Sequence, residues 1–462
     1  MLMGIRLQAR PTNKQKKSLS QWMGCARFVW NAKCQEDKYL STFAQKYMAI
    51  GTYAPFDQKY SQYKDRKLSP FLFECPSQIL RNSASNWFST YKDFLKARSG
   101  KPKFKRKDSS GSIHLTKELF SFESDEGGRK ALKIGTKKFD IGVLDLNYHR
   151  DFKEPKSLYI KKKAGSWWVS FCYDDDLKEE ELIGQKEHLK YLSSKSKEDL
   201  LERTIGIDRG IARPVQAGSS VFDFTDSQKR SKSRKERYLK KYQRRLSRQK
   251  KGSKRRERTK TKIAKSHQKI SAIRKDFCHK TTSSLVKSSK QIFILEDLKT
   301  SNMTRRAKPK RCENTGSYKS NRGRAKSGLN KAILDKGWHQ IELFLSYKTY
   351  RAGKVMFKVP AFYTSQECAN CSHTHPDNRK SQSIFSCVSC GYRANADENA
   401  ALVISKRAIN LIKDSGTELS KRGVLLGSGC GAISKTRRAK ASSAGGKEAS
   451  KKTRKEVALA AA

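Results

Sequence analysis

The chain has 462 residues, of which 101 are Lys or Arg and 44 are Asp or Glu, so its formal net charge at pH 7 is +57. Hydrophobic residues make up 36%, enough for folded cores, and this length predicts about two to four domains. No stretch approaches the ~18 apolar residues of a membrane-spanning helix, and the first residues lack the apolar core of a secretory signal. So large a positive excess calls for a polyanionic partner, and nucleic acid is the simplest one.

The N-terminal part of the chain predicts a helical segment flanked by strands. Residues 1–10 alternate like a short strand, and Thr12 and Gln15 form a capping box at the start of a helix. We interpret residues 11–99 as a small helical domain. Residues 100–174 begin with a basic turn and continue with strand-like runs, spaced as in a β-barrel or small sandwich. The first strand can join that sheet, which would make the helical domain an insertion. The runs are residues 112–116, 141–148, 157–163 and 166–174.

The remainder of the chain has a different pattern. Residues 175–203 are rich in charge and are interpreted as a linker. From residue 204 strands and helices alternate, with strands expected at 204–210, 212–218, 291–298 and 354–360, and helices at 263–277, 329–350 and 396–413. The tail at 414–462 is dominated toward its end by Lys, Ala, Ser and Gly, and we expect most of it to be disordered.

A strongly basic run occupies residues 229–265, where 20 Lys or Arg stand against only Glu236 and Glu257. Tyr238 and Tyr242 lie four residues apart, so part of the run is expected to be helical. A solvated charged helix is the ordinary explanation of such a run, but the near absence of acids favours phosphate neutralisation. The candidate nucleic-acid contacts, including the basic turn after residue 100, are Lys101, Lys103, Lys105, Arg106, Lys240, Lys241, Arg244, Arg245 and Arg248.

Four of the eleven cysteines form two CxxC pairs separated by fifteen residues, namely Cys368, Cys371, Cys387 and Cys390. Four thiolates at this spacing match tetrahedral Zn²⁺, and a closed shell of four ligands indicates a structural site. The other cysteines are scattered, which indicates a reducing compartment and no disulfide framework. His373 and His375 lie between the pairs, and we interpret them as solvated loop residues.

Three carboxylates stand where strands end or a helix begins. Asp208 and Glu296 each end an apolar run, and Asp397 opens a predicted helix. Taken singly, they could be a turn residue, the end of an edge strand and a helix cap. Together they can converge and hold a pair of Mg²⁺ ions, which activate a water and stabilise the leaving oxygen of a phosphodiester.

Several short motifs, in order along the chain, resemble the TnpB family of insertion-sequence proteins, known as OrfB-type transposases and similar to compact type V CRISPR effectors. They are Gly206-Ile207-Asp208, Leu295-Glu296-Asp297-Leu298, Tyr363-Thr364-Ser365-Gln366, the double CxxC, and Ala396-Asp397-Glu398-Asn399-Ala400-Ala401. The N-terminal Pro11-Thr12, Gln15, Gly24-Cys25-Ala26-Arg27 and Asn31, with the turn Gly100-Lys101-Pro102-Lys103-Phe104-Lys105, are similar to the family as well. The resemblance covers the chain except residues 175–203 and the tail.

The resemblance implies a transposon-encoded, RNA-guided DNA endonuclease with a two-metal RuvC site, in which Asp208, Glu296 and Asp397 are the catalytic acids. The implied fold is multi-domain α+β. A wedge-type β-barrel (1–10 and 100–174) is interrupted by a helical recognition domain (11–99). An RNase H-like (RuvC) α/β nuclease domain (204–365 and 392–413) then carries an inserted zinc ribbon (366–391).

The implied partners are a guide RNA from the transposon end and a double-stranded DNA target with a short adjacent motif. We expect a monomer in the prokaryotic cytoplasm, associated with the nucleoid and not with a membrane. Three alternatives remain open: a guided DNA-binding repressor without cleavage, a CRISPR-locus effector of the same architecture, and a transposase proper. The intact acids disfavour the repressor, and the lack of a His-hydrophobic-His pair disfavours a transposase of the HUH kind.

Overall fold

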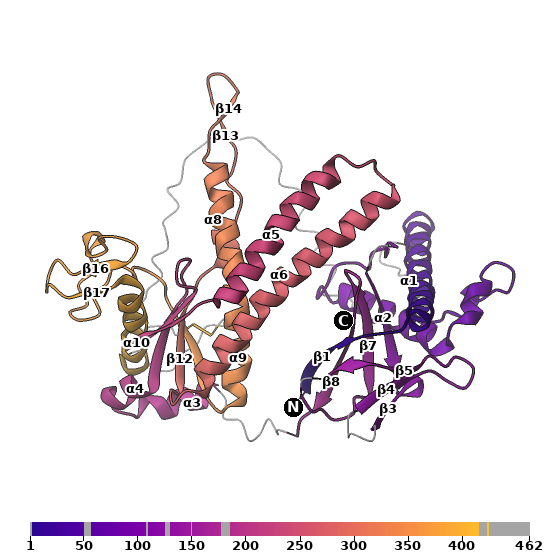
Figure 1. Cartoon of the computed structure of the whole chain (residues 1–462), viewed down its shortest axis with the longest axis horizontal. Helices are drawn as coiled ribbons and strands as arrows, with labels where there is room; N and C mark the ends of the chain where they lie inside the picture. The colour runs from indigo at the N-terminus through magenta and orange to yellow at the C-terminus, as the bar shows by residue number, and fades with distance from the viewer. Residues whose placement is uncertain are drawn as a thin grey trace.

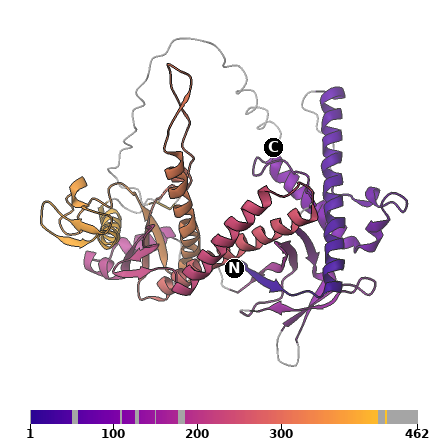
Figure 2. The same ribbon diagram turned by 45° about the horizontal axis from the view of Figure 1, so that its top comes forward.

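The computed structural model describes residues 2–49, 57–107, 110–124, 130–148, 150–176, 185–414 and 423–424. Figures 1 and 2 show an N-terminal group of strands and helices beside a second, α/β group formed by the later residues. The predicted disorder of the tail concerns residues outside this description, apart from residues 414, 423 and 424. None of the helices in these ranges combines the length and the hydropathy that a membrane-spanning segment needs.

The N-terminal group contains two long helices and eight strands among the described residues. Its elements are β1 (Leu2–Ala9), α1 (Asn13–Tyr47), η1 (Ser61–Tyr63), η2 (Pro70–Glu74), α2 (Ser77–Leu95), β2 (Gly111–Thr116), η3 (Lys117–Leu119), β3 (Phe120–Ser124), β4 (Lys130–Ile134), β5 (Gly142–Leu144), β6 (Leu146–Asn147), β7 (Ser157–Lys163) and β8 (Ser166–Asp174). The strands form one five-stranded antiparallel sheet, β2-β7-β8-β1-β6, and one three-stranded sheet, β3-β4-β5. Strand β1 pairs along its whole length with β8, so α1 and α2 lie in sequence between strands of a single sheet.

Alternation along β1 explains how the helices cover this sheet. Ile5, Leu7 and Ala9 are buried while the residues between them are exposed, because successive side chains point to opposite faces. These three side chains share one core with Leu19 and Trp22 of α1. The sheet therefore has a helix-covered face, and this core holds the N-terminal group together.

Helix α1 begins as predicted and ends later than predicted. The Gln15 amide donates to the Thr12 hydroxyl at 3.3 Å, and the Thr12 amide donates to the Gln15 side chain at 2.8 Å, which completes the capping box. The apolar spacing stops near Trp30, whereas the helix continues to Tyr47. Beyond Cys34 it buries only Asp37, so this part carries no apolar stripe that sequence could reveal.

The expected β-barrel is an open sheet in the part of the chain that the structure describes, with β2 and β6 at its two ends. The predicted run at 141–148 is split, because β5 belongs to the three-stranded sheet and β6 to the five-stranded one. The sequence prediction also misses β3 and β4, whose interspersed Ser, Glu and Lys residues give a weak apolar pattern.

The second group is an α/β unit with two small hairpins. Its elements are α3 (Gln185–Ser193), α4 (Lys197–Arg203), β9 (Thr204–Asp208), β10 (Val215–Ala217), β11 (Ser220–Phe222), α5 (Asp226–Ser247), α6 (Lys254–Lys287), β12 (Ile292–Glu296), α7 (Thr300–Met303), β13 (Lys310–Arg311), β14 (Tyr318–Lys319), α8 (Gly323–Lys336), α9 (Trp338–Arg351), β15 (Val355–Val359), η5 (Pro376–Asn378), β16 (Ile384–Ser386), β17 (Arg393–Asn395) and α10 (Ala396–Asp414). The main sheet has the order β11-β10-β9-β12-β15, in which β9, β12 and β15 run parallel.

Helices cover both faces of this sheet. Phe293 and Leu295 of β12 pack in one core with residues of α6 and α9. Ile292 and Ile294, which point the other way, pack with residues of α3, α4 and α10. All five residues of β12 are buried, as expected for a parallel strand between two helical layers. The faces matter for function, because they decide which side chains at the strand ends can meet.

The interpretation of residues 175–203 as a linker is wrong for its second half. Residues 185–203 form α3 and α4, and Leu189, Leu192 and Leu200 are fully buried against the sheet. Both helices are shorter than ten residues, so their few leucines stand out little among the charges. The predicted helix at 329–350 is likewise two helices, α8 and α9, separated by Gly337 with φ +74°. A left-handed residue ends a helix, and glycine adopts that conformation at no steric cost.

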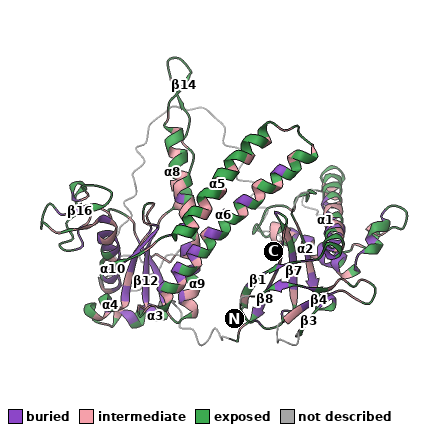
Figure 3. Ribbon diagram, in the orientation of Figure 1, coloured by how far each residue is buried: buried purple, intermediate pink, exposed green. Residues whose placement is uncertain are grey.

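Helices α5 and α6 form an antiparallel pair that projects from the sheet toward the N-terminal group in both views (Figures 1 and 2). Helix α5 has no buried residue, and its exposed surface is evident in Figure 3. Helix α6 buries Ile270 at its midpoint and Ile273 and Phe277 beyond it. The basic run at 229–265 therefore forms a solvent-exposed arm anchored to the sheet by α6.

Candidate active site and metal centre

Asp208 and Glu296 end two neighbouring parallel strands and lie on the same face of the sheet. Ile207 pairs with Leu295 in register, which places Asp208 beside Glu296 at the carboxyl edge. Ile207 and Leu295 pack on the face covered by α6 and α9. Their successors must point to the opposite face, where α10 lies, because side chains alternate along a strand. Strand β12 lies between β9 and β15, so Glu296 does not end an edge strand.

A close approach between β9 and α10 brings the third carboxylate to the same place. A Cβ atom on Gly206 would lie only 2.1 Å from the Ala401 carbonyl oxygen, so only glycine lets α10 pack this tightly. Asp397 lies one turn before Ala401, in the first turn of α10. The Asn395 side-chain oxygen accepts the Asp397 amide at 3.1 Å, so Asn395 and not Asp397 performs the capping role. The Asp397 carboxylate is therefore not used to cap the helix and can serve as a metal ligand.

The electrostatics of the three acids reflect this convergence. Burial, followed by the charges of Glu296 and Asp397, raises the pKa of Asp208 to about 7. Burial also raises the pKa of Glu296, against the lowering effects of the Thr364 hydroxyl and the Arg209 guanidinium. A buried cluster of carboxylates that repel one another is costly when ionised, and a bound cation removes that cost.

Basic side chains near the acids are engaged mainly with other groups. Arg209 is fully buried, and its guanidinium donates to the Glu296 carbonyl oxygen at 2.6 Å and to the Glu342 carboxylate at 3.2 Å. Lys358 donates to the same Glu342 carboxylate at 3.0 Å. Arg379 approaches Asp397 only to 3.9 Å. These contacts fix the backbone at the strand end and leave the acid cluster without full neutralisation.

The carboxylates interact without closing to metal-ligand range. Among the described residues, only the four cysteines place three or more potential ligand atoms within 4.8 Å of one another. A cation shared by Asp208, Glu296 and Asp397 would draw their oxygens closer than they lie here. The chemistry of the donors fits hard divalent cations, which prefer carboxylate oxygens.

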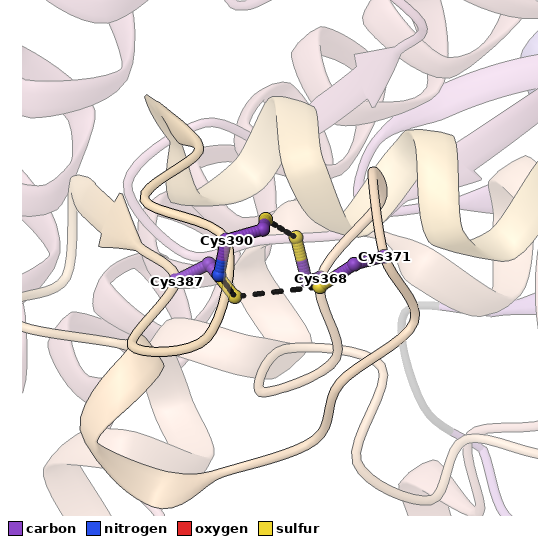
Figure 4. Close-up of side chains that lie close together, drawn as sticks. All are labelled: Cys368, Cys371, Cys387 and Cys390. Atoms are coloured by element: carbon purple, nitrogen blue, oxygen red, sulfur yellow. Dashed lines mark hydrogen bonds between the residues drawn. The ribbon is translucent and has the colours of Figure 1, made fainter.

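Cys368, Cys371, Cys387 and Cys390 gather as the spacing predicts, and they could hold a metal ion (Figure 4). The sulfur of Cys368 lies 3.7 Å from that of Cys390, and the sulfur of Cys371 lies 3.6 Å from that of Cys387. Each CxxC pair is followed by a left-handed residue, Ser372 at φ +61° and Gly391 at φ +72°. The backbone N–H of Tyr392 is the main cause that lowers the pKa of Cys390, to about 6.

The two loop histidines stand apart from this cluster. His373 and His375 are exposed, and their rings stack on each other at 6.1 Å. The Nδ1 atom of His375 accepts the Asp377 amide at 3.2 Å. The prediction that they are loop residues agrees with this placement.

The sequence of this chain is 30% identical over 401 residues to the "Putative RNA-guided DNA endonuclease InsQ" of Escherichia coli (strain K12), covering 87% of this chain and 90% of that relative. The chain belongs to the TnpB family. A second relative, the "Putative RNA-guided DNA endonuclease" of Streptomyces pristinaespiralis, is 25% identical over 85% of each chain. Three family models match this TnpB-family chain. They are "Helix-turn-helix domain" at residues 1–36, "Probable transposase" at 188–307 and "Cas12f1-like, TNB domain" at 338–404.

One solved structure, "Cryo-EM structure of the Cas12f1-sgRNA-target DNA complex", matches 88% of this TnpB-family chain and 98% of its own chain. The TM-score is 0.49 at 12% identity, a likeness too distant to bear on function.

The predicted nucleic-acid contacts of this TnpB-family chain lie on two exposed surfaces. The α5 group, Lys240, Lys241, Arg244, Arg245 and Arg248, is exposed throughout. The turn at 100–107 is fastened to α1, where Asn31 exchanges two hydrogen bonds with the Lys105 backbone at 2.8 and 2.9 Å. Lys101, Lys103, Lys105 and Arg106 are all exposed there. Lys101 also pairs with Asp37, and the Lys105 ammonium lies 3.3 Å from the Trp30 ring centroid.

A cationic cleft of about 1280 Å³, which no sequence pattern predicts, lies between the N-terminal sheet and helices α6 and α9. Arg6, Arg150 and Lys275 line it from three segments that are far apart in the chain. Burial, followed by repulsion from Arg6 and Arg150, lowers the pKa of Lys275. No local signal could reveal this cluster, because only the fold brings the three cations together. The basic hairpin at 304–326 is absent from the predicted contacts, although nine Lys or Arg stand there against Glu313 alone, a signal that the sequence does carry.

Proposed function

We propose that this TnpB-family chain is an RNA-guided DNA endonuclease encoded by a transposon, and that it hydrolyses phosphodiester bonds of guide-matched DNA. The observation that carries the proposal is the convergence of Asp208, Glu296 and Asp397 on one face of the sheet. Two relatives whose names describe such an endonuclease, matched over most of the chain, support it.

The three carboxylates would hold two Mg²⁺ ions. When bound, these ions activate a water and stabilise the leaving oxygen of the phosphodiester. The chain itself contributes the burial of Glu296, the partial burial of Asp208 and Asp397, and the hydrogen bond from Thr364 that orients Glu296. We assign residues 204–365 and 392–413, with α3 and α4 added, to an RNase H-like (RuvC) nuclease domain.

We assign the four cysteines to a structural Zn²⁺ in a ribbon at 366–391. A tetrahedron with metal–sulfur bonds of about 2.3 Å has edges of about 3.8 Å. The sulfur separations of 3.6 and 3.7 Å agree with that edge length. Four thiolates leave no open position, so this zinc would stabilise the ribbon and take no part in hydrolysis.

The guide RNA and the target DNA supply the polyanions that the +57 charge calls for. In this division of labour, base pairing reads the target and the protein contributes charge, shape recognition and one hydrolytic site. The exposed cations of α5, the turn at 100–107 and the cleft that contains Lys275 are the surfaces that we assign to phosphate contacts. Residues 1–10 together with 100–174 would form the wedge domain, and residues 11–99 would form the recognition domain.

The test begins with the RNA. The protein is purified from cells that carry its native flanking DNA, and the co-purifying RNA is sequenced. A discrete RNA that overlaps the 3′ end of the gene is expected, and it provides the guide for a cleavage assay. Random cellular RNA, or none, would favour an enzyme that binds DNA directly. A guided complex that binds its target and leaves it uncut would favour a repressor.

A further inference from the structure

The segment at 360–369 connects β15 to the first CxxC pair, and we call it the ribbon base. It is fastened to α10 at several points. Arg407 donates to the carbonyl oxygens of Pro360 and Phe362, at 2.8 Å each, and also pairs with Glu367. Lys406 donates to the Ala369 carbonyl oxygen. The ribbon base therefore moves with the helix that carries Asp397.

Asn399 is the innermost of these fastenings. It is fully buried, it lies two residues after Asp397, and its side chain forms two hydrogen bonds to the ribbon base. Its oxygen accepts the Ala369 amide at 2.9 Å, and its nitrogen donates to the Glu367 carbonyl oxygen at 2.8 Å. A buried amide with both ends satisfied holds its neighbours in one register, because any shift leaves a polar group unpaired.

The same ribbon base contacts the other acid-bearing element. The Thr364 hydroxyl donates to the Oε1 atom of Glu296 at the end of β12, and both side chains are buried, with 4% and 7% of their surfaces exposed. Tyr363, the preceding residue, adopts φ +56° and accepts the Gln366 amide at 2.8 Å. A left-handed aromatic residue is uncommon, and it persists only where the surroundings hold it. The turn thus aims Thr364 at Glu296.

We propose that Thr364 and Asn399 are positioning residues for the acid site, and that the ribbon base sets the placement of Glu296 relative to Asp397. Thr364 occupies one carboxylate oxygen and fixes its rotamer, which leaves the second oxygen for a metal ion. Asn399 ties that same segment to α10. Partners that hydrogen-bond a metal-ligating side chain orient it, and their loss typically weakens metal affinity or activity by about 10- to 100-fold. The inference rests on the proposed function, which makes Glu296 and Asp397 metal ligands.

The test measures Mn²⁺ binding to the full chain, with free Mn²⁺ followed by electron paramagnetic resonance. The component that Asp208→Ala removes defines the acid site. Thr364→Val keeps the volume and removes the hydroxyl, and it is expected to weaken that component about tenfold. Thr364→Ser keeps the hydroxyl and should stay within about twofold of wild type. Thr349→Val is the matched control, because Thr349 is also buried and its hydroxyl bonds only within its own helix.

Asn399→Ala is expected to cause a similar loss with zinc content per chain unchanged. Its control is Asn82→Ala, a buried asparagine of α2 whose side chain donates to the His114 carbonyl oxygen in the N-terminal group and contacts neither the ribbon base nor α10. If Thr364→Val does not fold, Thr364→Ala takes its place. Equal Mn²⁺ binding by Thr364→Val and wild type, equal losses in Thr364→Val and Thr364→Ser, or the same loss in Asn82→Ala would overturn the inference.

The readout separates this inference from the proposed function. If wild type shows the Asp208-dependent Mn²⁺ component and the Thr364 effect, yet never cuts a guided target, the positioning roles stand and the endonuclease proposal fails. If wild type cuts and Mn²⁺ binding ignores Thr364 and Asn399, the endonuclease proposal stands and the positioning roles fail. Absence of any Asp208-dependent component overturns the positioning roles as well.

Discussion

The amide of Gly206 donates a 2.6 Å hydrogen bond to the Ser405 hydroxyl, across a separation of 199 residues. This bond lies where β9 and α10 are closest, and it sets how deeply the helix sits on the sheet. Asp208 lies two residues beyond Gly206, and Asp397 lies two turns before Ser405. The glycine–serine contact therefore fixes the distance between the first and third carboxylates of the site.

Gly206→Ala is expected to disrupt the acid site. The added methyl group would overlap the Ala401 carbonyl oxygen, so α10 must shift, at a cost of about 1–3 kcal/mol in the free energy of unfolding. Cleavage should fall at least about tenfold, because a displacement near 1 Å misplaces the reacting groups. Thermal unfolding and guided cleavage measure the two effects. Gly328→Ala, where a Cβ meets no atom within 4 Å, is the control, and equal behaviour of the two variants would refute the packing argument.

Asp208 should make stability depend on pH. Its folded-state pKa of about 7 lies above the ordinary 3.8, so between these values the folded protein binds more protons than the unfolded chain. Stability is therefore lost as pH rises from about 4 to 7 and remains lost above 7. In Mg²⁺-free buffer, Asp208→Asn should raise the Tm far more at pH 8 than at pH 5. At pH 8 the free energy of unfolding should increase by a few kcal/mol, on the order of the pKa shift converted to energy. The exposed Asp276→Asn serves as control, and a gain independent of pH would contradict this account.

Removal of one thiolate should release the ribbon metal. Cys371→Ser is expected to lower zinc per chain and to destabilise residues 366–391, because structural zinc binding is coupled to folding. Elemental analysis of the purified chain measures the zinc, and limited proteolysis locates the loosened segment. Cys172→Ser changes an exposed free cysteine on β8 and should leave both readouts as in wild type. Zinc content that is unchanged in Cys371→Ser would show that the cluster is not the zinc site.

The cleft that contains Lys275 should contribute to RNA binding through charge. Lys275→Gln is expected to weaken binding of the co-purified RNA and to reduce the slope of log K against log salt by about 0.7–0.9, the contribution of one phosphate contact. Lys280→Gln is the control on the same helix, since Lys280 pairs with Asp276 at the surface and lies outside the cleft. A slope that is equal for the two variants would remove the cleft from the RNA interface.

Some parts of this molecule could be predicted from sequence because their signal is local. The double CxxC spacing is one example, and the buried run that ends at Glu296 is another. Other parts depend on contacts across the chain. Thr364 and Glu296 are 68 residues apart, and no pattern near either residue announces their hydrogen bond. The helices at 185–203 show a third case, in which three buried leucines decide the structure of a segment whose composition is mostly polar and charged.

The most direct test of the central claim is cleavage by the purified complex of this chain with its cognate RNA. A matched DNA duplex with the correct flanking motif is incubated in Mg²⁺ with wild type and with Asp208→Ala, and target binding is measured in parallel. The account predicts cutting by wild type only, with target binding by Asp208→Ala within about twofold, because Asp208 is assigned as a metal ligand and not as a phosphate contact. Cutting by Asp208→Ala at the wild-type rate, or loss of binding equal to the loss of cutting, would contradict it.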